Sequence, residues 1–293
     1  MKKITARALA LLIVMSSVFV SGPGVAASCD CTRFKFDLGN NGVFPSECAP
    51  ENNDLVKRWS YMTGGSVTCA PLVVSGKVYV ASWDNKMYCL DAEKGTLSWS
   101  AKIGGVLNGI CYDSDRVYAS CTDKRVYCLD AKTGKQLWVF TMSSASISNP
   151  LVYLGKLYAA CGKTNDKTNK GDNYIYCLDA KTGKAIWKVK NQVGFEASPA
   201  IAGGKIVIGS NDNCMYCFDA TNGKQLWKSA RVGSEFDAPA SISVASGKIY
   251  AGNWDKKLYC LDLKTGKTLW TYLAGGPILT TPTIAEGKIY FGS

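Results

Sequence analysis

Acidic side chains stand beside aromatic or amide side chains at several turns of this chain, and these pairs are the best candidates for binding a ligand. They occur as Trp83-Asp84, Phe195-Glu196, Asp212 between two asparagines, Glu235-Phe236-Asp237 and Trp254-Asp255. Aromatic rings and acids around a concave surface suit a peptide, a sugar or a cationic group. The alternative is that Trp83 and Trp254 pack on neighbouring strands and cap the ends of hairpins. Both interpretations stay open from the sequence.

Cysteine is abundant and histidine is absent, which limits the available chemistry. The chain has 13 cysteines and no histidine, which excludes His-dependent triads, His-ligated haem and His-containing zinc sites. Cys214 and Cys217 have the spacing of a redox motif. That motif belongs at the start of a helix, whereas this segment reads as a turn leading into a strand, so we do not expect a redox site.

A repeated segment positions these residues. Tyr-Cys-Leu/Phe-Asp, a glycine-containing turn and then a tryptophan occur five times, and the tryptophans are Trp99, Trp138, Trp187, Trp227 and Trp270. Their spacings of 39, 49, 40 and 43 residues, together with short alternating segments, predict a radial array of small antiparallel sheets. We expect each tryptophan to pack between adjacent sheets. The five cysteines at the second repeat position are expected to be small buried side chains.

Each repeat reads as four strands, A to D. In the copy over residues 148–191, strand A covers 148–153, strand B 157–160 and strand C 174–178, and strand D contains Trp187. Period-2 alternation bounded by Gly, Asn or Asp is typical of such strands. The B–C turns and the D–A connections share one face of a propeller, here called the B–C face. The candidate binding residues all fall on it, as does an insertion at residues 163–173.

The turn sequence Asp-Ala-Lys-Thr-Gly-Lys-x-Leu/Ile-Trp at 130–138 and 179–187 resembles the tryptophan-docking repeat of pyrroloquinoline-quinone (PQQ)-like propellers. Related stretches lie at 91–99, 219–227 and 262–270. This superfamily includes quinoprotein alcohol dehydrogenases and BamB-type outer-membrane assembly lipoproteins. The resemblance covers residues 55–293 and implies an all-β propeller of four-stranded blades. Members commonly have Ala where all five copies here have Cys.

The number of blades is less regular. Trp59 matches the tryptophan of a lone strand D, and residues 281–293 match strands A and B. Together they make a partial sixth blade without a strand C, whereas the resemblance implies eight blades as the common number. Either the propeller contains a three-stranded sixth blade or the chain is a fragment of a larger propeller.

The first residues carry export features. Residues 1–27 combine Lys2, Lys3 and Arg7 with an apolar stretch and small residues at 25–27, which is typical of a secretory signal peptide. Residues 28–54 are expected to form a cysteine-containing linker. A loose lipobox would make Cys29 a possible lipid anchor. No segment is long and apolar enough for a transmembrane helix, so we expect an exported protein that is periplasmic, extracellular or at the cell surface.

The charge favours some partners over others. The formal net charge is +11, and loss of Lys2, Lys3 and Arg7 with the signal leaves +8. Lysines gather in the A–B and C–D turns of the face opposite the B–C face, where they could contact an anionic polymer or simply solubilise the turns. Nucleic acid is not expected, because aromatic residues are not interleaved with these lysines.

Two functions remain. The first is a non-catalytic propeller that binds or scaffolds proteins or envelope polymers, as the BamB resemblance implies, with no cofactor and no metal. The second is a dehydrogenase, or a fragment of one, which by resemblance would hold PQQ and calcium over the channel with an Asp as base. That family characteristically has an adjacent Cys-Cys disulfide, which this sequence lacks. Glu196, Glu235 and Asp237 lie in the region where such a site would be.

Overall fold

A computed structural model describes residues 57–293 apart from residue 106, residues 163–172, residues 235–241 and residue 286. The described residues form five four-stranded antiparallel sheets and one two-stranded sheet. These residues contain no helix, so none that could cross a membrane. The all-β propeller expected from the repeat is confirmed. The predicted signal peptide and the whole of the predicted linker lie outside the described residues.

The blades follow one another along the chain, each with its strands in sequential order. Blade 1 consists of β1 (Leu72–Val74), β2 (Lys77–Ser82), β3 (Lys86–Asp91) and β4 (Leu97–Lys102). Blade 2 consists of β5 (Leu107–Asp113), β6 (Arg116–Cys121), β7 (Arg125–Asp130) and β8 (Gln136–Thr141). Blade 3 consists of β9 (Leu151–Tyr153), β10 (Lys156–Ala160), β11 (Asn173–Asp179) and β12 (Ala185–Asn191).

The chain continues in the same way to its end. Blade 4 consists of β13 (Ala200–Ala202), β14 (Lys205–Gly209), β15 (Met215–Asp219) and β16 (Gln225–Lys228). Blade 5 consists of β17 (Ile242–Ala245), β18 (Lys248–Gly252), β19 (Lys257–Asp262) and β20 (Thr268–Leu273). The last pair is β21 (Thr283–Ala285) with β22 (Lys288–Tyr290). These two strands correspond to strands A and B of the partial sixth blade.

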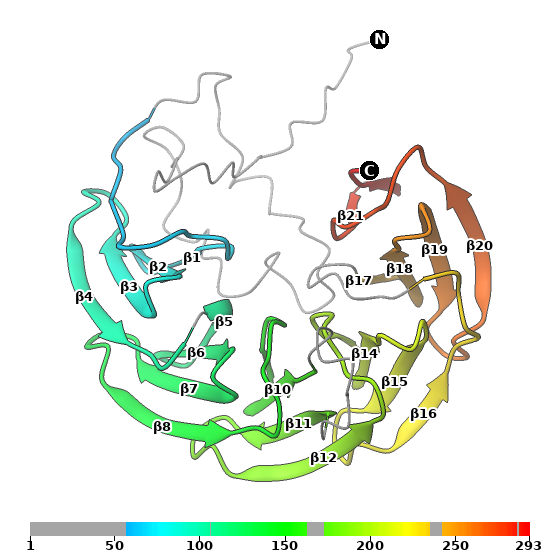
Figure 1. Ribbon diagram of the computed structural model, residues 1–293, viewed down its shortest axis with the longest axis horizontal. Coiled ribbons are helices and arrows are strands. Elements are labelled where there is room, and N and C mark those ends of the chain that lie inside the picture. The colour runs from blue at the N-terminus through cyan, green and yellow to red at the C-terminus, as the bar shows by residue number, and fades with distance from the viewer. Residues whose placement is uncertain (1–56, 106, 163–172, 235–241, 286) are drawn as a thin grey trace.

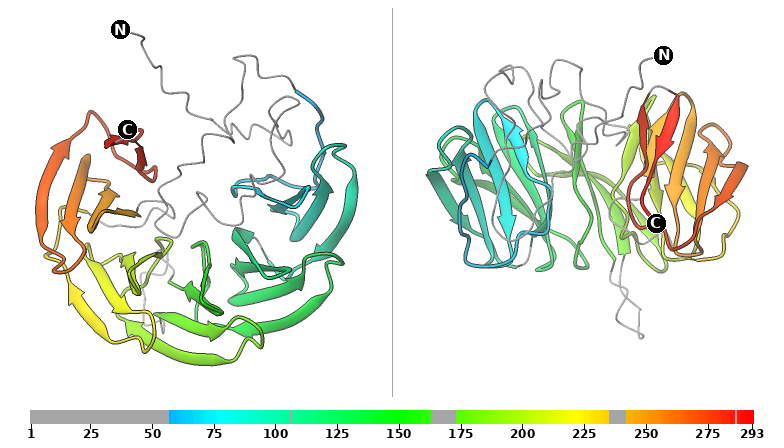
Figure 2. Two further views of the ribbon diagram at one scale, coloured as in Figure 1. Left: turned by 180° about the vertical axis from the view of Figure 1, so that it is seen from behind. Right: turned by 90° about the horizontal axis from the view of Figure 1, so that it is seen from above.

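The blades are arranged around an axis, with β1, β5 and β17 toward the centre and β4, β8, β12, β16 and β20 on the rim (Figure 1). Seen from the side, their strands run roughly along that axis (Figure 2). Blade 1 and the β21–β22 pair are the two ends of the arc that the described blades form. No ladder joins these two ends within the described part of the chain.

The strand-D tryptophans of blades 1 to 4 each contact the C–D turn of the following blade. The indole Nε1 of Trp99 donates to the carbonyl of Ala131 at 3.0 Å, and that of Trp138 donates to Ala180 at 3.2 Å. Trp227 donates to the carbonyl of Leu263 at 2.9 Å. The indole also lies on the turn glycine, where an added Cβ would come within 2.6 Å of the Trp99 ring at Gly134. Trp187 lies on Gly223 in the same way, but its Nε1 has no hydrogen-bond partner among the described residues.

The tryptophans at the two ends differ. Trp59 lies outside any described strand, yet its Nε1 donates to Ala92 at 2.9 Å and its ring lies on Gly95. It therefore fills, on blade 1, the position that a preceding strand D would fill. Trp270 is 40% exposed, against 9% for Trp99 and Trp227. The described residues include no C–D turn after β22, which is why Trp270 is more exposed.

The recurring blade geometry also explains the five repeated cysteines. Cys89, Cys128, Cys177, Cys217 and Cys260 are each no more than 1% exposed. In strand C the side chains alternate, so that Tyr127 and Leu129 pack with Trp99 of the preceding blade, while the intervening cysteine points toward the following one. A small apolar side chain fits this tightly packed position.

Candidate functional site

The acids of the B–C turns are bound to tyrosines four residues later. Tyr127 donates to Asp123 at 2.5 Å, Tyr216 to Asp212 at 2.5 Å and Tyr259 to Asp255 at 2.5 Å, and Tyr88 donates to Asp84 in the same way. The spacing follows from a tight turn that leads into strand C. An Asp followed by a Tyr at the fourth position is visible in the sequence and could have indicated these bonds.

Backbone amides complete the environment of these carboxylates. Asp84 accepts from the amide of Lys86 at 3.2 Å and from Gly64, in the D–A connection, at 3.1 Å. Burial opposes ionisation of Asp84, but hydrogen bonds from Tyr88, Ser82 and the two amides hold its pKa below the ordinary value. Burial, together with the Asp84 hydrogen bond, raises the pKa of Tyr88 to about 12. The carboxylate therefore stays ionised and joins the B–C turn to the D–A connection.

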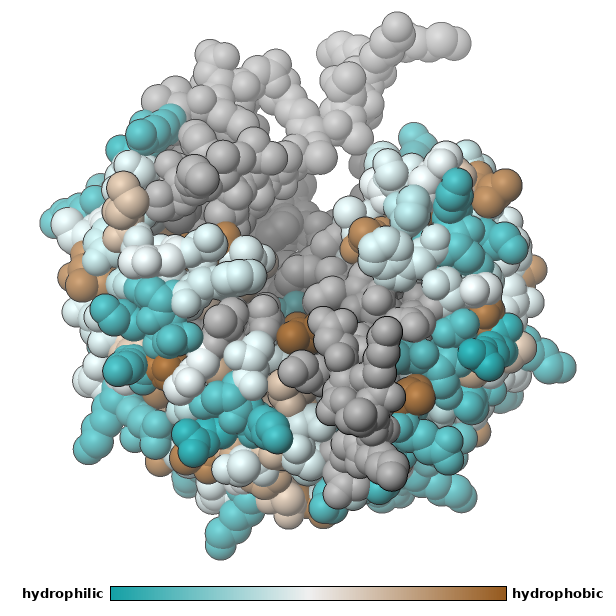
Figure 3. Space-filling view, in the orientation of Figure 1, coloured by the Kyte–Doolittle hydropathy of each residue, from teal (hydrophilic) through white to brown (hydrophobic). Residues whose placement is uncertain are grey.

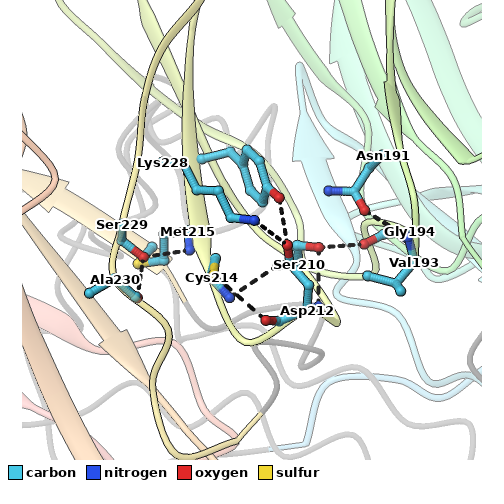
Figure 4. Close-up of polar contacts among 11 residues, drawn as sticks. Asn191, Val193, Gly194, Ser210, Asp212, Cys214, Met215, Lys228, Ser229 and Ala230 are labelled. Carbon is cyan, nitrogen blue, oxygen red and sulfur yellow. Dashed lines mark hydrogen bonds and ion pairs between the residues drawn. The ribbon is translucent and has the colours of Figure 1, made fainter.

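Asp212 has the additional feature of a lysine partner. Lys228 Nζ lies 2.9 Å from the Asp212 carboxylate and 5.1 Å from the centre of the Tyr216 ring. Figure 4 shows Lys228, the last residue of β16, beside Asp212 in the turn between β14 and β15, and it shows Ser210 of the same turn donating to the Gly194 carbonyl. Burial opposes ionisation of Asp212, and the hydrogen bonds from Tyr216 and Lys228 lower its pKa nonetheless. This arrangement stabilises blade 4 and leaves neither charged group unpaired.

We expect Asp212→Asn to lower the free energy of unfolding by about 1–3 kcal/mol at pH 7, because a hydrogen-bonded charged partner is lost. A carboxyl with a lowered pKa contributes stability above its unfolded pKa of about 4, and this contribution is lost as the pH falls through the folded pKa. The difference in free energy of unfolding between the unmutated protein and Asp212→Asn should therefore shrink below pH about 4, as urea titrations over a pH series would show.

Asp115→Asn is the control, since the Asp115–Lys132 pair is exposed. This substitution should change the free energy of unfolding by less than about 0.5 kcal/mol. Equal losses of unfolding free energy from the two substitutions would contradict the stabilising role assigned to the Asp212 contacts.

The two tryptophans of the B–C face are accessible. Trp83 is 51% exposed and Trp254 is 45% exposed. Trp83 lies in the turn between β2 and β3, where its Nε1 donates to Thr68 at 2.8 Å, and Trp254 lies in the equivalent turn between β18 and β19. They therefore occupy corresponding places in blade 1 and blade 5, the two blades nearest the ends of the arc (Figure 1). About half of each residue is available to a ligand or partner.

The predicted pair Phe195-Glu196 is buried. Phe195 is 1% exposed and packs edge-on against Tyr216 and Phe218. Glu196 is 3% exposed. Phe195 therefore belongs to the core between blades 3 and 4, and neither side chain belongs to the accessible surface that carries Trp83 and Trp254. The third predicted group, Glu235, Phe236 and Asp237, lies outside the described residues.

The described acids do not suit a calcium-bound quinone. Asp84, Asp123, Asp212 and Asp255 each sit in a different blade, and each is bound to its own tyrosine. Within the described part of the chain, no three His, Cys, Asp or Glu side chains form a group that could hold a metal ion. Calcium needs several converging oxygen ligands. The described residues therefore do not fit the PQQ and calcium group that the resemblance implied, while Glu235 and Asp237 lie outside the described part of the chain.

The ten described cysteines are all buried, and no disulfide joins any two of them. Burial raises the pKa of Cys69 and Cys177 to about 11, and of Cys121, Cys128 and Cys217 to about 12. Cys217 lies in β15, a strand, so the Cys214–Cys217 spacing is not at a helix start. The thiolate is the reactive form of cysteine, and it is disfavoured here.

We therefore expect these thiols to be unreactive in the folded protein. In a variant with Cys29, Cys31 and Cys48 changed to serine, a thiol titration at pH 7.5 should detect fewer than about one thiol per chain. In denaturant it should detect all ten. Rapid reaction of two or more thiols in the folded protein would contradict the burial of these side chains.

The lysines of the opposite face are exposed, as turn residues usually are. Lys94, Lys132, Lys181, Lys224 and Lys264, in the C–D turns, all have high exposure. Figure 3 shows one face of the molecule, on which hydrophilic residues cover much of the blades and hydrophobic residues form small separate groups. The exposure of the C–D turn lysines is compatible with either a solubilising role or an anion-binding role.

Comparison with known proteins places this architecture in a family. The family model described as outer membrane protein assembly factor BamB matches residues 51–108, 103–168, 167–252 and 216–293. Comparison with curated protein sequences finds no match.

Solved structures share the fold. BamB from Moraxella catarrhalis is 18% identical with a TM-score of 0.66, covering 80% of this chain and 71% of that one. The quinohemoprotein alcohol dehydrogenase from Comamonas testosteroni is 16% identical with a TM-score of 0.68, covering 87% and 50%. A europium-containing methanol dehydrogenase is 15% identical with a TM-score of 0.71, covering 84% and 58%. The chain thus spans little more than half the length of these dehydrogenases.

At such identities the structural likeness shows the fold alone, but the family match extends from residue 51 to residue 293. The matched range contains all five tryptophan-docking repeats and every described blade. This chain belongs to the PQQ-like repeat family of β-propellers, by its match to the BamB family model.

Proposed function

We propose that the chain is an exported, non-catalytic propeller that binds or scaffolds other proteins of the cell envelope through its B–C face. The observation that carries this proposal is the contrast between Trp83 and Asp84. Trp83 is half exposed, whereas Asp84 is held by Tyr88 and by backbone amides. Trp254 and Asp255 repeat the contrast in blade 5.

Exposed tryptophans are frequent anchors of protein interfaces, because a large ring buries much apolar surface with few rotatable bonds. A carboxylate that is bound to a tyrosine and a backbone amide is poorly placed to accept a substrate proton. The B–C face therefore offers apolar surface for contact with a partner, and its described carboxylates are not arranged as catalytic bases. The family's description as an outer membrane protein assembly factor supports protein partners and an envelope location, and the signal-like residues 1–27 support export.

Quantitative affinity purification from cells that produce the full chain tests this proposal. We expect W83A/W254A to reduce the recovery of specific envelope proteins by at least about tenfold, as hot-spot tryptophans do. The matched control is L137A/L226A, because these leucines are similarly exposed, at 45% and 43%, but lie on the rim strands β8 and β16. Equal recovery with both double variants would overturn the assignment of the B–C face. A bound quinone absorption band, or a higher melting temperature with PQQ and Ca²⁺, would overturn the non-catalytic assignment.

A further inference from the structure

The A–B turn of blade 3 carries an exposed leucine in an unfavourable backbone conformation. Leu154 lies between β9 and β10, is 79% exposed and has a φ of +48°. The equivalent turn residues of the other complete blades also have positive φ, and they are Ser75, Ser114, Gly203 and Ser246. Glycine and short polar residues adopt this conformation most readily. Folding alone would therefore favour such a residue at position 154, and neither burial nor backbone geometry accounts for the leucine.

Hydrogen bonds of the turn place Leu154 among lysines. The carbonyl of Gly155 accepts from the amide of Ala180, in the C–D turn of the same blade, at 2.9 Å. Lys156 Nζ donates to the carbonyl of Thr221, in the C–D turn of blade 4, at 3.4 Å. Leu154 therefore lies at the junction of the C–D turns of blades 3 and 4. The exposed lysines of these two turns are Lys181, Lys184 and Lys224.

Positive charge is concentrated on the same side of the molecule. The residues that connect strands A and B, or C and D, were compared from the last residue of the first strand to the residue that begins or precedes the next. In blades 1 and 2 these connections hold five basic and five acidic residues, whereas in blades 3 to 5 they hold eight lysines and three aspartates, a net charge of +5. Blades 3 to 5 are consecutive in the arc (Figure 1). Their eight lysines, here called the basic patch, are Lys156, Lys181, Lys184, Lys205, Lys224, Lys248, Lys264 and Lys267.

The aspartates of these connections are engaged within their own turns. Asp179 accepts from the hydroxyl and from the backbone amide of Thr182, both at 2.7 Å, and these bonds hold its pKa below the ordinary value. Among the described residues, none of the eight lysines forms an ion pair, whereas in blade 1 Lys77 lies 3.4 Å from Asp91. The ammonium groups of the basic patch are therefore available to an anionic partner.

The arrangement of the patch indicates the kind of partner. Its lysines belong to six connections in three blades, so they suit many separate anionic groups spread over a surface better than one compact anion. Leu154 would gain free energy only where its side chain leaves water. An anionic bilayer supplies both contacts, because its head groups attract lysines and an apolar layer lies directly beneath them.

We propose that the face formed by the A–B and C–D turns of blades 3 to 5 docks on an anionic lipid surface. Leu154 inserts below the head groups, and the lysines of the basic patch contact lipid phosphates. This face is opposite the B–C face, so Trp83 and Trp254 stay accessible to a protein partner while the chain is on the membrane. The inference does not rest on the function proposed for the B–C face.

Vesicle flotation of the full chain after signal removal tests the proposal, with Cys29→Ser present to remove the possible lipid anchor. The protein should float with phosphatidylcholine vesicles that contain about one third phosphatidylglycerol, and not with phosphatidylcholine alone. K181Q/K224Q should lower the partition coefficient at least about tenfold, since each lysine near such a surface contributes roughly a factor of five. The matched control is K124Q/K256Q, which removes the same charge from B–C turns and should change partitioning less than about twofold.

The leucine is tested separately. L154S should lower the partition coefficient at least about fivefold, and it should fold because serine occupies the equivalent position in three other blades. L154G, which relieves the backbone conformation, should show the same loss, and thermal melting checks that both variants are folded. The control is L273S, because Leu273 is 67% exposed but lies at the opposite end of strand D.

Three outcomes would overturn the proposal. The first is no flotation of the unmutated protein with anionic vesicles, which would leave the patch as solubilising turns or as a site for an acidic protein. The second is equal flotation with neutral and anionic vesicles. The third is equal partitioning of L154S and L273S, or of K181Q/K224Q and K124Q/K256Q. The vesicles contain no protein, so each of these failures leaves the proposed role of the B–C face unaffected.

Discussion

Replacement of Trp99 by alanine is expected to lower the free energy of unfolding by about 3–5 kcal/mol, the usual range for a buried tryptophan. Trp99 is 9% exposed, donates to Ala131 and contacts Tyr79 at 6.0 Å between ring centres. Its loss removes apolar contact between blades 1 and 2 and leaves the Ala131 carbonyl with one donor fewer. Urea unfolding followed by circular dichroism would measure the change.

Leu97→Ala is the matched control, because Leu97 lies two residues earlier on β4 and is 45% exposed. It should change stability by no more than about 0.5 kcal/mol. If Trp99→Ala were no more destabilising than Leu97→Ala, the tryptophan would not be what holds blade 1 to blade 2.

Replacement of Gly134 by alanine should have the second-largest effect, a loss of about 2–5 kcal/mol. Gly134 has a φ of +72°, which costs a residue with a Cβ about 1–2 kcal/mol. The added Cβ would also lie 2.6 Å from the Trp99 ring, and overpacking of this kind costs about 1–3 kcal/mol more. The substitution therefore tests the contact between Trp99 of blade 1 and the C–D turn of blade 2 by changing the turn instead of the tryptophan.

Gly155→Ala separates the two contributions. Gly155 has a nearly identical φ of +70°, but no other group lies within 4 Å of the point that an added Cβ would occupy. Only the backbone cost of about 1–2 kcal/mol should remain. Thermal or urea unfolding of both variants would show the difference, and equal losses would mean that the Trp99 ring moves aside without cost.

The repeat in the sequence was sufficient to predict the blades, because it records contacts that recur in every copy. Trp99 and the Gly134 turn are such contacts, and their spacing follows from the length of strands C and D. Asp84 was harder to interpret, since an acid beside a tryptophan suggests a ligand until its bond to Tyr88 is seen. The recurrence of Asp and Tyr four residues apart in all five copies of the repeat was the available signal.

Phe195 shows a different limit. Its burial depends on Tyr216 and Phe218, which approach it only when blades 3 and 4 pack together. No local pattern around residue 195 contains that information. From its position in a D–A connection, the sequence analysis predicted that Phe195 is a candidate binding residue of the B–C face. The exposure of Trp83 and Trp254 likewise depends on how far the D–A connections extend over each B–C turn. The alternation of apolar and polar residues along a strand does not contain this information.

The direction of the tryptophan contacts has a thermodynamic consequence. Every described strand-D tryptophan from Trp99 to Trp227 reaches forward to the following blade, and Trp59 does the same at the start. Each blade therefore gains stability from contacts with its neighbouring blades, and each tryptophan contact runs from one blade to the next along the chain. This resembles a linear array of coupled units. A weakened tryptophan should loosen the C–D turn of the next blade along the chain more than its own sheet. The energetic unit of this fold is thus the junction between two blades, and its boundaries are offset from those of the sequence repeat.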